Sequence, residues 1–315
     1  MALLVACGGA TSPIPEASAP AAADDARAIL DDELAATARR PEIESALAVV
    51  LDARDGRVVA MQSFAGDVAD PELPARERRS HGSVGKVFTY AIALERGVLA
   101  PTDRLEGTSV EIGGERIHDR EERVSMSVED ALAFSSNVGA VHVLERLGAA
   151  SLVEGLTTLH LGTAAGATDD PLTAARLAYG PALEATPLEM ASAFAAVVNG
   201  GVYHAPWRTG EPATEGERVV SAETSRAMSA LLEATVTRED GTGHGAAVPG
   251  LRVAGKTGTM PLGGERTHGA FVGVVSVDAP RYVIVVDVIT RTGDYSGGTV
   301  AAPLFARIAT RLSSL

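Results

Sequence analysis

The sequence contains little cysteine, little lysine and few aromatic residues. Cysteine occurs once, at Cys7, which excludes an internal disulfide and a cysteine-based metal cluster. Aromatic residues make up 4% of the 315 residues, so the core must be built mainly from Ala, Val and Leu. No uninterrupted apolar stretch reaches the roughly 20 residues that a membrane-spanning helix needs.

Net positive charge is also absent. The formal net charge is −14, which argues against nonspecific binding to nucleic acid or anionic lipid, because both need a basic face. Hydrophobic residues account for 46% of the chain, enough for a sizeable core. We therefore expect an acidic globular protein, most plausibly an enzyme, with no nucleic-acid partner.

Only two of the 27 basic residues are lysines, Lys86 and Lys256. Arginine serves surface ion pairs as well as lysine does, but it cannot lose its proton in a protein and it is not a compact point charge. The two lysines are therefore candidates for a chemical role that arginine cannot fill.

The N-terminal residues predict export and a tether. Residues 1–7, M-A-L-L-V-A-C, read as a truncated signal whose L-V-A-C resembles a bacterial lipobox, with Cys7 as the lipidated residue and a chance lone cysteine as the alternative. Residues 8–40 are rich in Ala, Pro, Ser and Asp, which predicts a tether followed by a short helix near 24–39. A globular domain is predicted to span residues 41–315.

Five segments of this domain read as strands, and they lie near its two ends. They are residues 47–53, 58–63, 252–259, 269–277 and 281–290. The chain between them is Ala/Leu-rich and mostly helical, and residues 300–312 form a further predicted helix. Strands at both ends with helices between them predict an α+β fold, with an antiparallel sheet covered by helices.

The first lysine follows a serine at a useful spacing. Gly82-Ser83-Val84-Gly85-Lys86 opens an apolar helical segment, so Ser83 and Lys86 share one face. A neutral lysine can take the proton of a serine nucleophile, and burial with a neighbouring cation lowers a lysine pKa towards neutrality. The alternative is a structural lysine whose ammonium reaches solvent from the helix.

The second lysine invites a false assignment. Residues 250–257 fit the phosphate-binding pattern G-x-x-x-x-G-K-[ST], but glycines and a proline follow where that loop needs a helix, so we reject nucleotide binding. We instead expect an edge strand that presents Lys256, Thr257 and Thr259 beside a cleft, where Gly258 lets a substrate backbone come close.

A third candidate is the segment Ser135-Ser136-Asn137. It interrupts two helical segments, the first of which is capped by Ser127, and therefore predicts a loop between helices. A hydroxyl and an amide on this loop could reach a cleft to relay a proton and bind a peptide amide. The alternative is a simple interhelical turn.

S-V-G-K, S-S-N and K-T-G-T, in this order, resemble the three motifs of the penicillin-binding protein transpeptidase family, and the similarity covers residues 41–315. The resemblance implies a five-stranded antiparallel sheet flanked by helices, with an all-helical subdomain. It also implies a D,D-transpeptidase of the cell envelope, on the outer face of the cytoplasmic membrane. Its partners would be peptidoglycan stem peptides and β-lactam inhibitors, with neither cofactor nor metal.

The resemblance also assigns roles to the motif residues. Ser83 would be the nucleophile, Lys86 the general base and Ser135 the proton relay, while Asn137 would hold Lys86 and the substrate amide. Lys256 would be a further catalytic residue, which keeps the site electropositive, lowers the pKa of Lys86 and attracts a substrate carboxylate. Thr257, Gly258 and Thr259 would bind the substrate, and the backbone N–H groups of Ser83 and Thr259 would form the oxyanion hole. Two positions depart from the family: His81 replaces a more usual Pro or Glu, and Gly85 replaces a larger residue, so we expect looser packing beside Lys86.

Several alternatives stay open. A D,D-carboxypeptidase shares the acyl-enzyme, and a serine β-lactamase would need a Glu to activate water, for which Glu184 and Glu189 are the candidates. A β-lactam sensor would need a membrane span and a cytosolic module. A Ser-His-Asp hydrolase is disfavoured because His81-Gly82-Ser83-Val84-Gly85 misses G-x-S-x-G. We expect surface or structural positions for His118, His160, His244 and His268.

Overall fold

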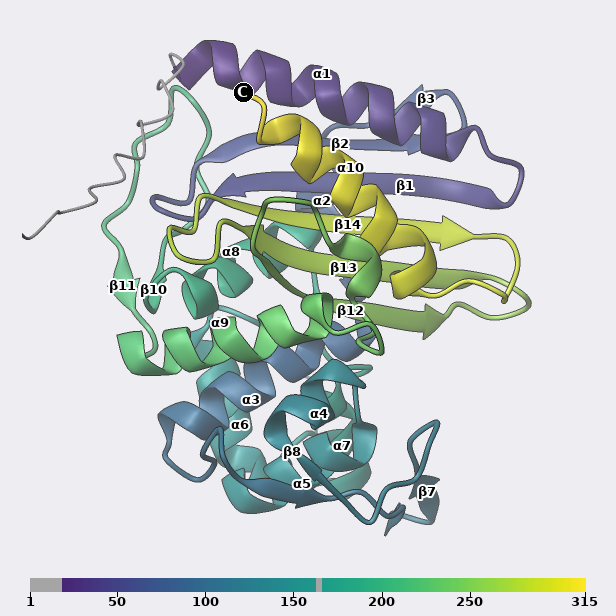
Figure 1. Cartoon of the computed structure of the whole chain (residues 1–315), viewed down its shortest axis with the longest axis vertical. Helices are drawn as coiled ribbons and strands as arrows, with labels where there is room; N and C mark the ends of the chain where they lie inside the picture. The colour runs from purple at the N-terminus through teal and green to yellow at the C-terminus, as the bar shows by residue number, and fades with distance from the viewer. Residues whose placement is uncertain (1–18, 163–165) are drawn as a thin grey trace, which may run out of the picture.

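A central antiparallel sheet organises the protein (Figure 1). The computed structural model describes residues 19–162 and 166–315. The strand order is β12-β13-β14-β1-β2-β3, so the two ends of the chain meet where β14 pairs with β1. Its strands are β1 (Ile43–Asp52), β2 (Val58–Ala65), β3 (Val68–Ala69), β12 (Val253–Pro261), β13 (Thr267–Val275) and β14 (Tyr282–Thr290).

The sheet is buried on both faces, and its side chains alternate between two cores. In the register Val49↔Val285 and Val50↔Ile284, the first pair faces the helical part and the second pair faces α1 (Ala19–Ala38) and α10 (Ala302–Leu312). Because both faces are covered, β1 and β14 are nearly continuous apolar segments rather than alternating ones.

α1 and α10 cover the outer face side by side. Leu30 and Leu34 lie one turn apart on the buried side of α1. Phe305 of α10 packs edge-on against Phe271 of β13, with ring centroids 4.7 Å apart. We grouped residues 24–39 with the tether, but this helix packs against the sheet; the domain boundary at residue 41 stays a prediction, and the signal and lipobox predictions at residues 1–7 lie outside the described residues.

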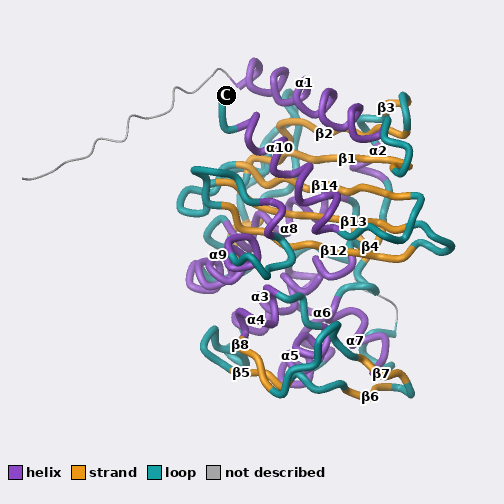
Figure 2. The backbone as a smooth tube through the Cα atoms, turned by 45° about the vertical axis from the view of Figure 1, so that its right-hand side comes forward, coloured by secondary structure: helices purple, strands orange, loops and turns teal. Residues whose placement is uncertain are grey.

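The opposite face and the β12 edge carry the remaining helices (Figure 2). α8 lies beneath β1 and β14, and α9 lies along β12, while α3 to α7 form a helical body beyond that edge. These helices are α2 (Leu73–Arg76), α3 (Lys86–Glu95), α4 (Val128–Ala133), α5 (Asn137–Leu147), α6 (Ala149–Thr158), α7 (Pro171–Tyr179), α8 (Pro187–Val198) and α9 (Ala222–Thr237).

Short two-stranded sheets pair the segments that connect these helices. β4 (Arg79–Ser80) pairs with β9 (Glu184–Ala185), directly before the turn that carries Ser83. The other ladders are β5 (Arg104–Glu106) with β8 (Ser125–Ser127), β6 (Val110–Ile112) with β7 (Glu115–Ile117), and β10 (Val202–Tyr203) with β11 (Glu217–Arg218).

The structure confirms the α+β class, and each of the five predicted strands overlaps a strand of the sheet. The predicted strand count was wrong by one, because β3 adds two residues to the edge, a strand too short to leave a periodic signal. Ser127 caps α4 as expected, through a capping box with Asp130. Among the described residues, no helix has the length and apolar character needed to cross a bilayer.

Replacing Phe305 by Ala should destabilise the domain strongly. The ring is fully buried between α10 and the sheet, so its loss removes apolar contacts and leaves a cavity. We expect the free energy of unfolding, measured by urea denaturation, to fall by about 3–5 kcal/mol. Thr310→Ala on the exposed side of α10 is the control and should change it by less than about 0.5 kcal/mol. Equal effects of the two variants would contradict the packing described here.

Candidate active site

Ser83 and Lys86 lie at a junction between two types of helix. A 3₁₀ turn spans Gly82–Gly85, and α3 begins at Lys86. Lys86 is fully buried, and its Nζ lies 2.7 Å from Ser83 Oγ, 2.7 Å from Asn137 Oδ1 and 3.3 Å from Tyr179 O. A neutral amine can donate to the two carbonyl-type oxygens and offer its lone pair to the Ser83 hydroxyl. This arrangement is the one that activates a serine for attack.

Glycines bring the surrounding backbone close to this turn. A methyl group on Gly85 would lie 2.7 Å from Gly180 Cα, and one on Gly180, where φ is +116°, would lie 1.9 Å from Gly82 O. The expectation of loose packing beside Lys86 was therefore wrong: the chain after α7 fills the space that a larger side chain would take at Gly85.

The second motif is held by a residue that the sequence analysis missed. Asp119 accepts hydrogen bonds from the Asn137 backbone N–H (2.6 Å), the Val138 N–H (3.3 Å) and the Ser136 hydroxyl. Ser136 in turn caps α5 by accepting from Gly139 N. Asn137 was predicted on the loop but is the first residue of α5, so its side chain projects towards Lys86 from a fixed helix end.

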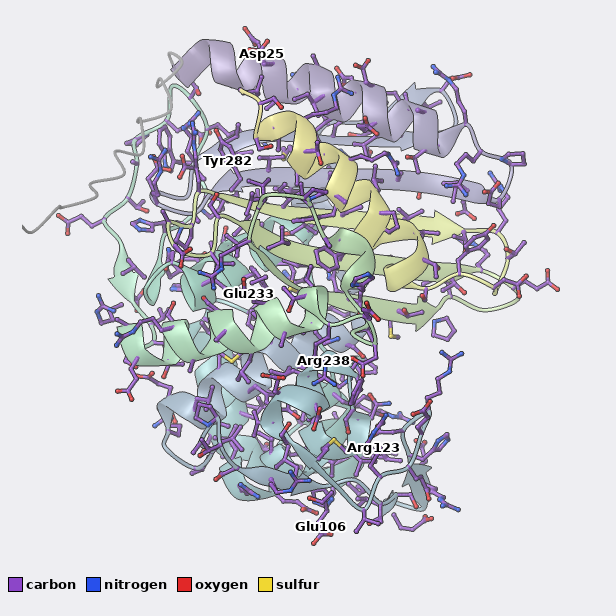
Figure 3. All side chains as sticks on the ribbon, in the orientation of Figure 1. Asp25, Glu106, Arg123, Glu233, Arg238 and Tyr282 are labelled. Atoms are coloured by element: carbon purple, nitrogen blue, oxygen red, sulfur yellow. The ribbon has the colours of Figure 1, made fainter. Side chains whose placement is uncertain are left out.

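Ser135 lies on the short connection between α4 and α5, with a left-handed φ of +61°. Two guanidinium groups lie over the ring of Phe134, the residue before it: Arg123 at 4.2 Å and Arg238 at 4.8 Å from the ring centroid. Both arginines are labelled in Figure 3. Arg238 also forms an ion pair with Asp130 of α4. These contacts hold the connection that carries Ser135, although nothing local in the sequence indicates them.

The third motif lies on β12, the edge strand of the sheet that faces the helical body. Lys256 is fully buried and donates to Thr257 O (3.1 Å), while Thr259 is exposed and its hydroxyl accepts from Gly297 N (3.0 Å). The position of Lys256 in a strand agrees with the rejection of a phosphate-binding loop. A methyl group on Gly258 would lie 1.8 Å from His81 O, so this strand packs directly on the chain before Ser83.

Burial lowers the pKa of both lysines. Burial, followed by the nearby Lys256 charge, lowers the pKa of Lys86 well below its ordinary value, while Asp119 acts in the opposite direction. Burial lowers the pKa of Lys256 to about 7. The site can therefore contain a neutral amine next to Ser83 and an ionisable one on β12 at physiological pH.

Residues considered for other chemistries lie elsewhere or are engaged. Glu189 caps α8 and binds Arg78 with both oxygens at 2.6 Å, and Glu184 is exposed on β9. His118, His160 and His244 are exposed, whereas His268 is buried. Across residues 19–162 and 166–315, no three His, Cys, Asp or Glu side chains are placed to hold a metal ion.

Comparison with known proteins places these features in one family. The sequence matches the penicillin-binding protein transpeptidase domain over residues 46–310. It is 33% identical over 319 residues to penicillin-binding protein PbpB of Mycobacterium tuberculosis, covering 83% of this chain and 46% of that protein. It is 29% identical over 333 residues to the probable peptidoglycan D,D-transpeptidase FtsI of Caulobacter vibrioides, covering 91% and 56%.

Solved structures agree with the sequence matches. The transpeptidase domain of Burkholderia pseudomallei penicillin-binding protein 3 superposes with a TM-score of 0.80 at 25% identity, covering 91% of this chain and 93% of that one. Penicillin-binding protein 3 of M. tuberculosis, complexed with aztreonam, gives 0.80 at 29% identity, covering 92% and 77%. The chain spans about half the length of the curated relatives it matches. This chain belongs to the penicillin-binding protein transpeptidase domain family.

Proposed function

We propose that the chain is a penicillin-binding D,D-transpeptidase, which acts on D-Ala-D-Ala stem peptides through an acyl-enzyme on Ser83 and cross-links peptidoglycan. The observation that carries this proposal is the buried Lys86 amine, which contacts the Ser83 hydroxyl and is oriented by Asn137. Such a substrate belongs to the cell envelope, on the outer face of the cytoplasmic membrane. Lipid attachment through Cys7 stays a prediction.

In the acylation step, Ser83 Oγ attacks the carbonyl carbon of the penultimate D-Ala while Lys86 Nζ takes its proton. The developing oxyanion accepts hydrogen bonds from the backbone N–H groups of Ser83 and Thr259. The close contact of Gly82 supports this pairing, since a methyl group there would lie 3.1 Å from Thr259 N. Ser135 then delivers a proton to the leaving D-Ala amine as the peptide bond breaks, and it takes a proton from the Lys86 ammonium in exchange, which restores the neutral amine.

The edge strand β12 would bind the substrate. A protonated Lys256 supplies positive charge for the terminal carboxylate, and the hydroxyls of Thr257 and Thr259 donate hydrogen bonds to it. The substrate backbone can lie along β12, an edge strand of the sheet, while the missing side chain of Gly258 accommodates His81 O. The amine of a second stem peptide attacks the ester, which forms the new amide and releases Ser83.

Hydrolysis is the competing outcome, as in a D,D-carboxypeptidase or a serine β-lactamase. A rapid β-lactamase needs a general base to activate water at the ester. The carboxylate of Glu189 is engaged by Arg78 and by the Thr186 N–H, and Glu184 lies exposed on β9. These contacts favour a long-lived acyl-enzyme with β-lactams.

A fluorescent penicillin should label Ser83 and remain bound for hours. The Ser83→Ala variant should take up no label, because it lacks the nucleophile, while Ser314→Ala at the exposed C-terminus should label normally. Gel fluorescence over time, with intact mass spectrometry, measures both uptake and loss. Loss of label within seconds would indicate a β-lactamase, and absence of label on folded wild-type protein would refute the proposed nucleophile.

The acylation rate should depend on pH through both lysines. It should fall at low pH as Lys86 gains a proton, and fall as pH rises through about 7, where Lys256 loses its charge. Lys256→Arg keeps the charge and should remove the alkaline fall, whereas Lys256→Gln should be slow at every pH. Stopped-flow acylation between pH 5 and 10 measures this. An alkaline fall retained in Lys256→Arg would contradict the assignment.

Gly180→Ala should slow acylation without touching a catalytic side chain. Its methyl group would lie 1.9 Å from Gly82 O and must displace the turn that carries Ser83. We expect a rate lower by roughly 10- to 100-fold, since small displacements of reacting groups have effects of this size. Gly148→Ala is a matched control, because Gly148 also has a positive φ but a methyl group there meets nothing within 4 Å. Similar rates in both variants would contradict the close packing.

A further inference from the structure

A buried cluster of three ionisable side chains lies behind the nucleophile, and the mechanism above does not use it. Asp287 of β14 has His81 Nε2 3.2 Å from one carboxylate oxygen and His268 Nε2 of β13 3.1 Å from the other. All three side chains are 1% exposed or less. The imidazole rings lie edge to face, with centroids 5.7 Å apart.

The cluster joins the middle of the sheet to the chain just before Ser83. His268 Nδ1 donates to Ser80 O (3.1 Å), and His81 lies two residues before the nucleophile. The Ser80 hydroxyl accepts from Gly82 N (3.2 Å) and donates to Gly180 O (3.3 Å). Ser80 and His81 therefore each contact a residue of the cluster, and the Ser80 hydroxyl links Gly82 to the loop at Gly180.

The hydrogen bond from His268 Nδ1 to Ser80 O anchors the cluster to the segment before Ser83. A carbonyl oxygen only accepts, so His268 Nδ1 carries a hydrogen. Burial alone would raise the pKa of Asp287, but the two adjacent histidines hold it well below its usual range. The carboxylate therefore keeps its charge in the interior, with an imidazole nitrogen near each of its oxygens.

We propose that His81, Asp287 and His268 are positioning residues for acyl transfer, which hold the segment before Ser83 against β12 so that the nucleophile and the Thr259 N–H stay in register. This inference rests on the proposed function. The contact of His81 O with Gly258, where a methyl group would lie 1.8 Å away, sets how closely the segment must sit on the K-T-G strand. A shift of the His81 carbonyl would move Gly82 and Ser83 with it.

The test separates acylation from binding with a chromogenic cephalosporin. Asp287→Ala should lower the acylation rate constant by about 10- to 100-fold and leave the initial dissociation constant within about threefold. Asp287→Asn keeps the shape and can hydrogen-bond both rings, so it should keep most of the rate. Phe305→Ala is the control for lost stability and should leave the rate constant unchanged, because it lies on the other face of the sheet.

A spectroscopic measurement tests the cluster independently of activity. In ¹⁵N NMR of wild-type protein, His268 Nδ1 should carry a proton, because it faces the Ser80 carbonyl oxygen, and Asp287→Ala should shift this resonance as the hydrogen bond weakens. Acylation rates of Asp287→Ala equal to wild type, or equal losses in Asp287→Ala and Phe305→Ala, would overturn the proposal. Wild-type protein that is not acylated at all would instead reject the proposed function, and the NMR result would then decide whether the cluster holds the Ser80 carbonyl.

Discussion

The site depends on burying one amine among uncharged partners. Lys86 contacts a hydroxyl, an amide oxygen and a backbone carbonyl, which come from three separate parts of the chain. Water would keep this amine protonated, so its basicity towards Ser83 exists only while the helical body is packed against the edge of the sheet. Folding and chemistry are coupled at this point, because any opening that admits water also restores the proton and removes the base.

Close backbone packing makes that burial possible. Gly85, Gly180 and Gly258 lie where the turn carrying Ser83 meets the chain after α7 on one side and β12 on the other, and none has room for a methyl group. Side chains at these positions would separate the segments and open a path for water. The glycines therefore act on Lys86 indirectly, by letting three backbones approach until the amine has no solvent contact. Gly85, which stands where the family more often has a larger residue, leaves room for the backbone at Gly180.

Much of this could be predicted from the sequence, and the rest depends on contacts between distant segments. The scarcity of lysine singled out Lys86 and Lys256, and apolar segments of five to ten residues located the main strands. Asp119 could not be found in this way, because it reaches the S-S-N motif from 17 residues upstream in an irregular loop. One usable signal was overlooked: Asp287 interrupts an otherwise apolar strand, Y-V-I-V-V-D-V-I-T, where a charge must have a partner.

Lys86 and Asp287 are both ionisable groups buried in the interior, but their surroundings act on their charges in opposite ways. The difference distinguishes the proposed base from a group that only positions the chain. Burial and then the nearby Lys256 charge lower the pKa of Lys86, and only Asp119 acts in the opposite direction, so the amine can lose its proton and serve as the proposed base. Desolvation of Asp287 is outweighed by two adjacent imidazoles, so its charge is retained and the group becomes a rigid junction between strands and turn. A counter-ion as close to Lys86 as the histidines are to Asp287 would restore its proton and abolish its use as a base. The reactive amine thus needs a neighbourhood poor in negative charge, and the anchor that positions Ser83 has to be kept apart from it, beyond the turn.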